Sequence, residues 1–351
     1  MIAPRLLVPG LTVLVVALFL CPAGSSDGAL VPGASLRPAP STSAWTQLAL
    51  TVHPPGLEGA GMTYDPAGKL VVLFGGVENS SGTWVTTNAT WEYSGGVWTK
   101  VHPRVAPSPR AGVYLAWDAF DRYLVLFGGT SSIQSCCHYL NDTWKFSNGS
   151  WTKLRPQTAP EPRAYGQVAY YPAIHSVFTL DGVGGPNGAY GNDSNIWAFS
   201  GGNWMKLGRD QWGAALGSLG PYPPGHDLVH VGCGAPGFFT EIYRGGHWIQ
   251  LKYQSATLGP CDDPFVWDPL YNASLLFDGG SGQNVSTWVF QRGTWSSLGA
   301  ANSPPFGGQA VAVYDVADRY VLEFGGATNY CGTTGRAGNS ACLLNETWVL
   351  R

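Results

Sequence analysis

Short hydrophobic runs that end in two glycines recur along this chain. The run Leu-Val-Val-Leu-Phe-Gly-Gly at 70–76 returns as Tyr-Leu-Val-Leu-Phe-Gly-Gly at 123–129, and related runs end at Gly185, Gly280 and Gly326. Apolar runs of about four to eight residues bounded by glycine are typical of buried β-strands. Their return at intervals of about fifty residues indicates an internal repeat, which decides the fold before any single motif does.

Each copy contains four predicted strands. A first strand such as 112–117 leads through a polar turn into the strand that ends in Gly-Gly, and the two form an antiparallel hairpin. After a variable loop, a third strand opens with Thr-Trp, as at Thr90 and Trp91, and a fourth strand opens with another tryptophan, such as Trp98. We interpret the tryptophans as wedges between neighbouring sheets. Aspartates are expected to shape the turns after the first strands: Asp65, Asp118, Asp268 and Asp315.

The two ends of the chain predict how the repeats close. The last third strand, Thr347–Leu350, is the sixth, and no fourth strand follows it. The segment Trp45–Leu48 has the fourth-strand pattern but precedes the first complete copy. If it completes the last sheet, no unpaired edge remains at either end of the ring. The sequence therefore predicts an all-β protein: a six-bladed β-propeller of four-stranded antiparallel blades, closed by the strand near Trp45.

Four-stranded units with one pair of tryptophans and one Gly-Gly resemble kelch repeats, and the resemblance covers residues 45–351. Galactose-oxidase-like copper enzymes share the kelch propeller, and they need two His and two Tyr ligands and a Tyr joined to a Cys. No histidine follows His247, so the C-terminal blades lack such ligands. No Cys pair has the spacing of a zinc site either. We therefore expect no metal and no cofactor.

The N-terminus has the features of a secretory signal. Arg5 precedes an apolar run from Leu6 to Leu20, and small residues follow. The run of about 15 residues is shorter than the ~20 that span a bilayer, so cleavage is expected, with an N-terminal anchor as the alternative. We assign 1–24 to the signal, 25–43 to a low-complexity linker rich in Pro, Ala, Ser and Gly, and 44–351 to the propeller.

Composition excludes some partners. Only 12% of the residues are charged, the formal net charge is -3, and no stripe of lysine or arginine could follow a phosphate backbone. We expect no nucleic-acid partner, and membrane contact only through an uncleaved N-terminal segment. The predicted location is secreted or on the cell surface.

Sequons and cysteines are consistent with export. Eight Asn-X-Ser/Thr sequons predict a glycoprotein, at Asn79, Asn88, Asn141, Asn148, Asn192, Asn272, Asn284 and Asn345. Six cysteines follow the signal, an even number that favours disulfide bonds in an oxidising compartment. Their places in the repeat predict the pairs Cys331–Cys342 and Cys233–Cys261. For the adjacent Cys136 and Cys137, a vicinal disulfide, free thiols and intermolecular bonds all remain open.

Three side chains are candidates for ligand binding on the face that carries the long loops after the second strands. Arg110 and Arg163 each follow a proline at the entry to a first strand, which places them at the channel mouth. Similar arginines contact acidic ligands in some kelch proteins, and a buttress for loop carbonyls is the alternative. Aligning the fourth copy on Trp248 places Glu241 where the other copies carry a tryptophan, so this carboxylate must be paired, protonated or hydrated. A decayed repeat with a shortened loop is the alternative.

The polar loops favour a non-catalytic binding or adhesion module that recognises a glycan or an extracellular protein. The alternative is a carbohydrate-active enzyme of the sugar isomerase or mutarotase type, with acid and base roles at Glu241, or at Asp262 and Asp263 beside the arginines. Glu58 could also reach the channel mouth, but two carboxylates of a glycosidase need a defined separation that the sequence does not supply. A third possibility is a surface-coat component that packs against its neighbours.

Overall fold

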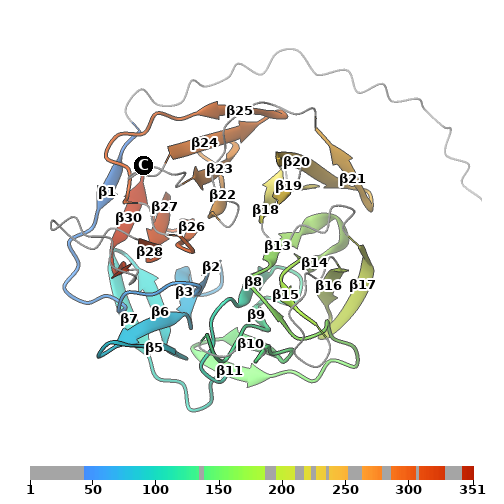
Figure 1. Ribbon diagram of the computed structural model, residues 1–351, viewed down its shortest axis with the longest axis horizontal. Coiled ribbons are helices and arrows are strands. Elements are labelled where there is room, and N and C mark those ends of the chain that lie inside the picture. The colour runs from blue at the N-terminus through green and yellow to red at the C-terminus, as the bar shows by residue number, and fades with distance from the viewer. Residues whose placement is uncertain are drawn as a thin grey trace, which may run out of the picture. The chain divides into compact units, whose positions relative to one another are not determined.

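The computed structural model describes residues 43–133, 138–185, 195–209, 217–222, 227–234, 237–251, 263–278, 286–305, 308–328 and 342–351. Within them, six four-stranded antiparallel sheets surround a common axis and form a six-bladed β-propeller, which confirms the predicted fold (Figure 1). The predicted signal and, apart from Ser43, the predicted linker lie outside the described residues.

Strands of each blade follow one another from the axis outward. Blade 1 contains β2 (Gly61–Asp65), β3 (Leu70–Phe74), β6 (Thr90–Ser94) and β7 (Val97–Val101). Blade 2 contains β8 (Tyr114–Asp118), β9 (Tyr123–Phe127), β10 (Thr143–Ser147) and β11 (Ser150–Lys153). Blade 3 contains β13 (Gln167–Tyr171), β14 (Ser176–Leu180), β16 (Asn195–Ser200) and β17 (Asn203–Arg209), with a short 3-10 helix, η1 (Pro172–Ile174), in its first turn.

The other three blades repeat this order. Blade 4 contains β18 (Gly217–Tyr222), β19 (Asp227–Gly234), β20 (Gly237–Arg244) and β21 (His247–Gln250). Blade 5 contains β22 (Phe265–Asp268), β23 (Ala273–Asp278), β24 (Ser286–Gln291) and β25 (Thr294–Ser297). Blade 6 contains β26 (Val311–Asp315), β27 (Tyr320–Phe324), β30 (Thr347–Leu350) and β1 (Trp45–Gln47). Three two-stranded ribbons accompany them: β4 (Val77–Ser80) with β5 (Thr83–Thr86), β12 (Arg163–Ala164) with β15 (Val183–Gly184), and β28 (Ala327–Thr328) with β29 (Cys342–Leu343).

Blade 6 joins the two ends of the described chain. β1 pairs antiparallel with β30, and Trp45 stands opposite Leu350. The Trp45 side chain is 1% exposed and packs edge-on against Phe277 of blade 5. The predicted closure by the strand near Trp45 is therefore confirmed.

A tryptophan-to-threonine hydrogen bond joins neighbouring blades at five of the six junctions. The indole Nε1–H of a fourth-strand tryptophan donates to the threonine at the Thr-Trp position of the preceding blade, over 2.9–3.1 Å. The pairs, donor first, are Trp98–Thr347, Trp151–Thr90, Trp204–Thr143, Trp295–Thr240 and Trp45–Thr287. Burying an indole requires an acceptor for its N–H, and these threonines supply it for the buried Trp45, Trp98, Trp151 and Trp204 and for the partly buried Trp295.

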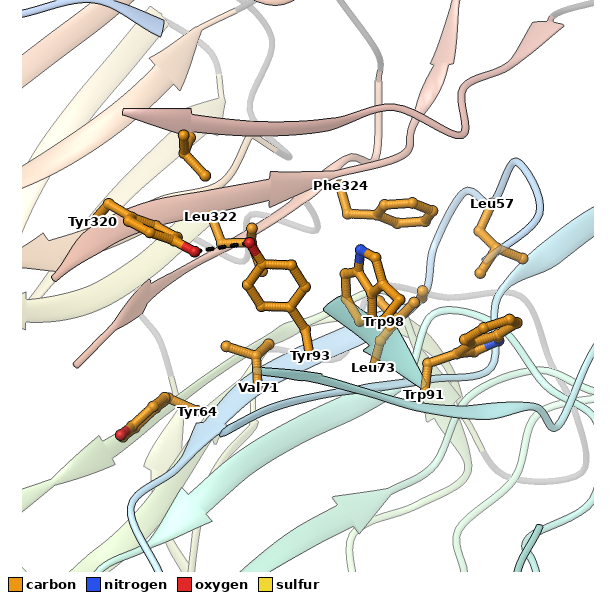
Figure 2. Packing of buried hydrophobic residues seen from close by; sticks show 12 residues of the cluster. Leu57, Tyr64, Val71, Leu73, Trp91, Tyr93, Trp98, Tyr320, Leu322 and Phe324 are labelled. Carbon is orange, nitrogen blue, oxygen red and sulfur yellow. Dashed lines mark hydrogen bonds between the residues drawn. The ribbon is translucent and has the colours of Figure 1, made fainter. Parts of the chain in front are cut away.

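Aromatic packing surrounds these wedges. Figure 2 shows the cluster between blades 1 and 6, where Trp98 lies 5.0 Å from the ring of Tyr93 and 5.5 Å from that of Phe324. The hydroxyl groups of Tyr93 and Tyr320 share a hydrogen bond of 2.7 Å across the junction. A fully buried aromatic side chain stabilises a core by about 1.5–3 kcal/mol, so each junction is a substantial part of the total stability.

Gly-Gly pairs bring the backbones of neighbouring blades close together. The Gly76 N–H donates to the Arg110 carbonyl over 2.9 Å, and the Gly129 N–H donates to the Arg163 carbonyl over the same distance. A Cβ on Gly75 would lie 2.6 Å from the Arg110 carbonyl oxygen, and its φ is +71°. Only glycine fits both restraints. The glycine pairs therefore allow the link that enters the next blade to approach closely.

The buried turn aspartates have the predicted role. Asp118 Oδ1 accepts hydrogen bonds from the N–H groups of Phe120 and Asp121. Asp65, Asp268 and Asp315 accept equivalent bonds in their own turns. Burial raises the pKa of Asp118 to about 6.

One buried carboxyl group interrupts a hydrophobic position. Glu323 of β27 is 4% exposed and stands opposite Trp348, as Leu73 stands opposite Trp91. Burial, followed by the negative charge of Glu346, raises the pKa of Glu323 to about 8. The carboxyl group is therefore protonated in the folded protein at neutral pH.

Replacing Trp45 tests the closure of the ring. We expect Trp45→Ala to lower the free energy of unfolding by about 3–5 kcal/mol, because it leaves a cavity between blades 5 and 6. Thr46→Ala, at the exposed neighbour on β1, is the control and should change stability by less than about 0.5 kcal/mol. Urea denaturation followed by tryptophan fluorescence measures both. Equal stabilities of the two variants would contradict a structural role for β1.

Glu323 predicts a pH dependence of stability. Its folded pKa lies above the ordinary value of 4.5, so its contribution is most favourable below pH 4.5 and is lost as the pH rises towards 8. Between pH 4.5 and pH 8, this loss lowers the free energy of unfolding by about 1.4 kcal/mol per pH unit. Glu323→Leu should remove it in denaturation curves recorded from pH 5 to pH 9. The exposed Glu161→Gln is the control. If Glu323→Leu and Glu161→Gln follow the same profile, the prediction fails.

Candidate functional site

A cavity of about 630 Å³ lies where the first strands of all six blades begin. Its wall contains one or more residues from each blade, including Met62, Leu115, Val168, Leu219, Phe265 and Ala312. Thr130, Ser132 and Tyr139, from the loop after β9, extend the wall. The cavity therefore opens on the face that carries the long loops, where a ligand site was expected.

A chain of backbone hydrogen bonds runs along the wall. Tyr165 N–H donates to the Gly112 carbonyl (2.9 Å), Gly112 N–H to that of Gly59 (2.7 Å), and Gly59 N–H to that of Gln309 (3.3 Å). All four residues have φ between 58° and 62°. This left-handed conformation is ordinary for glycine but costs other residues about 1 kcal/mol or more. Tyr165 and Gln309 thus occupy strained positions at the cavity, as functional residues often do.

The Tyr165 ring lies against glycine backbone. A Cβ on Gly112 would lie 2.8 Å from its ring carbons, so only glycine admits the ring there. Burial, with smaller contributions from the charges of Glu58 and Tyr139, raises the pKa of Tyr165 to about 12. Burial also raises the pKa of Glu58. Tyr165 is consequently a neutral phenol at physiological pH, which can both donate and accept a hydrogen bond.

Two amide side chains of the wall have a buried oxygen with no hydrogen-bond partner among the described residues. They belong to Gln167, which is 7% exposed, and to Gln309. Gln309 Oε1 lies 3.1 Å from the point that a Cβ on Gly59 would occupy. Buried polar atoms are normally hydrogen-bonded, and an exception at a cavity indicates a place where a ligand or water donates.

Asp263 is the acidic residue of the described wall. It stands at the repeat position held by Ala60, Val113, Gly166, Gly217 and Ala310 in the other blades. The Ser218 hydroxyl donates to its backbone carbonyl over 2.6 Å. The structure thus places the predicted candidate Asp263 at the cavity, and its neighbour Asp262 lies outside the described residues.

Arg110 is buried away from the cavity wall. It is 1% exposed and forms an ion pair with Asp142 at 2.6 Å. It also donates to the carbonyl oxygens of Gly128 and Ser108. These contacts match the alternative role as a buttress for loop carbonyls. Arg163 is equally buried, and its Nε donates to the Glu161 carbonyl. Neither arginine lines the cavity.

Glu241 lies in the junction between blades 3 and 4. It stands opposite Gln250, as Trp91 stands opposite Lys100. Glu241 therefore occupies the position that holds a tryptophan in the other blades, as the sequence alignment predicted. Its side chain is 0% exposed, and Oε1 lies 3.0 Å from Nδ1 of His230. The sequence analysis required this carboxylate to be paired, protonated or hydrated, and the structure shows that it is paired. The structure does not bring Glu241 to the cavity or to either arginine.

Three wall residues were missed by the sequence analysis: Tyr165, Gln167 and Gln309. Tyr165 follows Gly112 by one repeat, and Gly112 follows Gly59 by the same interval. A search for residues that replace a repeated glycine would have found Tyr165. No comparable signal marks Gln167, because its equivalents Gly61 and Tyr114 share no pattern with it.

Six predicted glycosylation sites fall on described, exposed residues: Asn79, Asn88, Asn141, Asn148, Asn272 and Asn345. Asn192 and Asn284 lie outside the described residues. Each predicted disulfide has one cysteine outside the described residues, Cys331 or Cys261. Cys136 and Cys137 both lie outside them as well. The glycans and the disulfide pairs therefore remain predictions.

Among the described residues, no group of three or more His, Cys, Asp or Glu side chains could hold a metal ion. A search of the same residues finds no helix with the length and hydropathy to cross a membrane.

Comparison with known proteins yields a structural match but no sequence family. No model of a known protein family matches the chain, and no curated protein sequence does. A solved structure titled "Structure of YjhT" superposes with a TM-score of 0.58 over 85% of this chain and 95% of that chain, at 16% identity. At this identity the match supports the propeller fold alone.

Asp142 tests the buttress role of Arg110. Asp142→Ala should lower the free energy of unfolding by about 3–5 kcal/mol, because it leaves a buried guanidinium group without its anion. Lys153→Ala is the matched control. Lys153 Nζ lies 3.6 Å from the same carboxylate but is 56% exposed, so its loss should cost less than about 1 kcal/mol. Thermal unfolding compares the two variants, and a cost no larger for Asp142→Ala than for Lys153→Ala would exclude the buttress role.

Proposed function

We propose that this protein is a secreted or cell-surface module of the kelch type that binds the end of a glycan in the cavity on its long-loop face. The observation that supports this most strongly is the pair of buried amide oxygens of Gln167 and Gln309, which lack hydrogen-bond partners in the cavity wall. Saccharide hydroxyl groups are donors that would satisfy them.

The shape and chemistry of the cavity support a saccharide over a protein surface. Its volume of about 630 Å³ is typical of small-molecule sites, which are concave, whereas most protein partners dock on wider, flatter surfaces. Tyr165 and Tyr139 offer aromatic surface, and Thr130 and Ser132 offer hydroxyl groups. The described lining residues include no lysine or arginine, so an uncharged sugar is favoured over a phosphorylated one.

The predicted signal sequence and sequons support an extracytoplasmic location. The kelch assignment is supported by the glycine pairs and tryptophans, whose repeated contacts join neighbouring blades. Arg110, Arg163 and Glu241 have no place in this binding site, because each contacts other parts of the protein from outside the cavity wall.

A carbohydrate-active enzyme of the isomerase or mutarotase type is a second candidate. One observation favours it: burial raises the pKa of the Glu58 carboxyl group, and the charge of Glu58 acts on the Tyr165 phenol. A carboxyl group with a raised pKa is suited to general acid or base catalysis. In this alternative, Asp263 and Tyr165 of the cavity wall would transfer protons to and from a bound sugar, and the charge of Glu58 would act on Tyr165.

A glycan array followed by calorimetry with the bound saccharide tests the binding function. Gln167→Ala and Gln309→Ala should each weaken binding by about tenfold, because one hydrogen bond in a buried site is worth about 1–1.5 kcal/mol. Gln250→Ala, at an exposed position on β21, is the control and should bind as the wild type does. If no glycan binds, or if all three variants bind equally, the proposal is wrong.

Isomer analysis of the same saccharide by NMR separates the two candidates. A binding module leaves the rate of anomer exchange unchanged. An enzyme accelerates it, and Asp263→Asn should then abolish turnover while the saccharide still binds.

A further inference from the structure

The tight turns of the blades lie on the face opposite the cavity. The first strands begin at the cavity wall and end at these turns, and the third strands run in the same direction. We name this the short-turn face, and its described turns are 66–69, 95–96, 119–122, 148–149, 172–175, 201–202, 245–246, 269–272, 292–293 and 316–319. Ser43 also lies on this face, where its hydroxyl shares a hydrogen bond with that of Tyr271.

Exposed apolar side chains stand at the tips of the first turns. Phe120, Ile174, Leu270 and Val316, from blades 2, 3, 5 and 6, are 38–60% exposed. The rings of Phe120 and His175 lie 5.9 Å apart, so the turns of blades 2 and 3 form one surface. Single exposed apolar residues are ordinary, whereas a set gathered on one face indicates an interaction site.

The exposed charged side chains of the described turns, and of the residues that flank them, are all cationic. They are Lys69, Arg122, Arg244, Arg292 and Arg319, and Arg351 adds another beside Tyr320. The carboxyl groups of these segments, such as Asp118 and Asp121, are buried or partly buried. Arg244 forms an ion pair with Asp227. The short-turn face is thus basic, although the chain has a net charge of -3.

Three of these cations occupy a strained backbone position. Lys69, Arg122 and Arg319 stand four residues after the turn aspartates of blades 1, 2 and 6, with φ between 55° and 63°. Blade 5 has Asn272 there, and asparagine adopts this left-handed conformation more readily than lysine or arginine. The geometry of the turn alone would favour asparagine or glycine. A long cation at this position in three consecutive blades therefore indicates a use for its charge.

We propose that the short-turn face docks on an anionic lipid surface. The apolar tips enter the headgroup region, and Lys69, Arg122 and Arg319 lie beside the phosphate groups. An anionic membrane supplies both complements of this face, a negative surface potential and an apolar layer beneath it. The contact is additional to the membrane contact expected of an uncleaved N-terminal segment.

The place of Ser43 agrees with this orientation. In the sequence, the linker and the apolar run from Leu6 to Leu20 precede it, so an anchor retained there would join the propeller at the short-turn face. Docking by this face would leave the cavity pointing away from the lipid. The proposal does not depend on which ligand, if any, the cavity binds.

Vesicle flotation of the full-length protein tests the docking. Protein without glycans is used, because the predicted sites Asn148 and Asn272 lie at turns of this face. The wild type should bind vesicles of phosphatidylcholine and phosphatidylglycerol more tightly than vesicles of phosphatidylcholine alone, and salt should reduce the difference. Lys69→Asn/Arg122→Asn/Arg319→Asn should weaken binding to the mixed vesicles by about a hundredfold, since each cation contributes about fivefold. Asparagine relieves the strain, so this variant should remain folded.

The control has the same change of charge on another surface. Lys100→Gln/Lys153→Gln/Lys206→Gln removes three exposed cations from the fourth strands of blades 1, 2 and 3 and should bind as the wild type does. Equal binding of the two triple variants, or a wild type that does not prefer the mixed vesicles, would overturn the proposal.

Hydrogen exchange locates the contact even if the N-terminal segment also inserts into the vesicles. Mixed vesicles should slow exchange at 66–69, 119–122 and 316–319, but not at the ribbon of β4 and β5 on the cavity face. Phe120→Ser/Leu270→Ser/Val316→Ser should reduce this protection.

The matched control for this apolar variant is Val105→Ser/Met205→Ser/Ile249→Ser, which changes residues of similar exposure outside the short-turn face and should leave the protection unchanged. Protection confined to the cavity face would refute the docking surface. Protection of the turns by self-association without vesicles would assign the face to a second copy of the chain and would likewise refute it.

Discussion

The pairing of β1 with β30 is the constraint on which the rest of this structure depends. A ring of blades is stable only if every edge is paired or covered, because an exposed strand edge has unsatisfied backbone groups. Here two short strands from opposite ends of the propeller meet, and the buried Trp45 joins them to blade 5. The cavity wall and the junctions between blades depend on that contact, because it closes the ring.

Within the closed ring, five of the six junctions use the same hydrogen bond. An indole N–H donates to a threonine in the preceding blade, and the N–H groups of Gly76 and Gly129 donate to carbonyl oxygens of the links that enter the following blades. These contacts are polar and directional, so they position neighbouring blades more narrowly than hydrophobic packing alone. Where the pattern fails, between blades 3 and 4, the buried side chains of His230 and Glu241 face each other, with Nδ1 and Oε1 3.0 Å apart.

The fold could be predicted from the sequence because the pattern of one blade recurs in several copies that can be aligned. The role of Trp45, the turn aspartates and the exceptional position of Glu241 followed from alignment of the copies. The site could be predicted only in part. Asp263 was found, but Asp142, the partner of Arg110, lies in the loop before β10, and His230, the partner of Glu241, lies on a different strand. Contacts between distant segments leave no local pattern. The amides of Gln167 and Gln309 are candidate binding groups because their oxygens are buried at the cavity. Composition and residue spacing do not indicate such tertiary surroundings.

The location of β1 has a consequence for how the protein is made. Its partner β30 lies at the other end of the propeller, so β1 stays without this partner while the residues between the two strands are synthesised. During that time blade 6 is incomplete and the edges of a nearly finished ring are open to other chains. The pairing of β1 with β30 therefore completes blade 6 only after the other strands of the propeller have been synthesised.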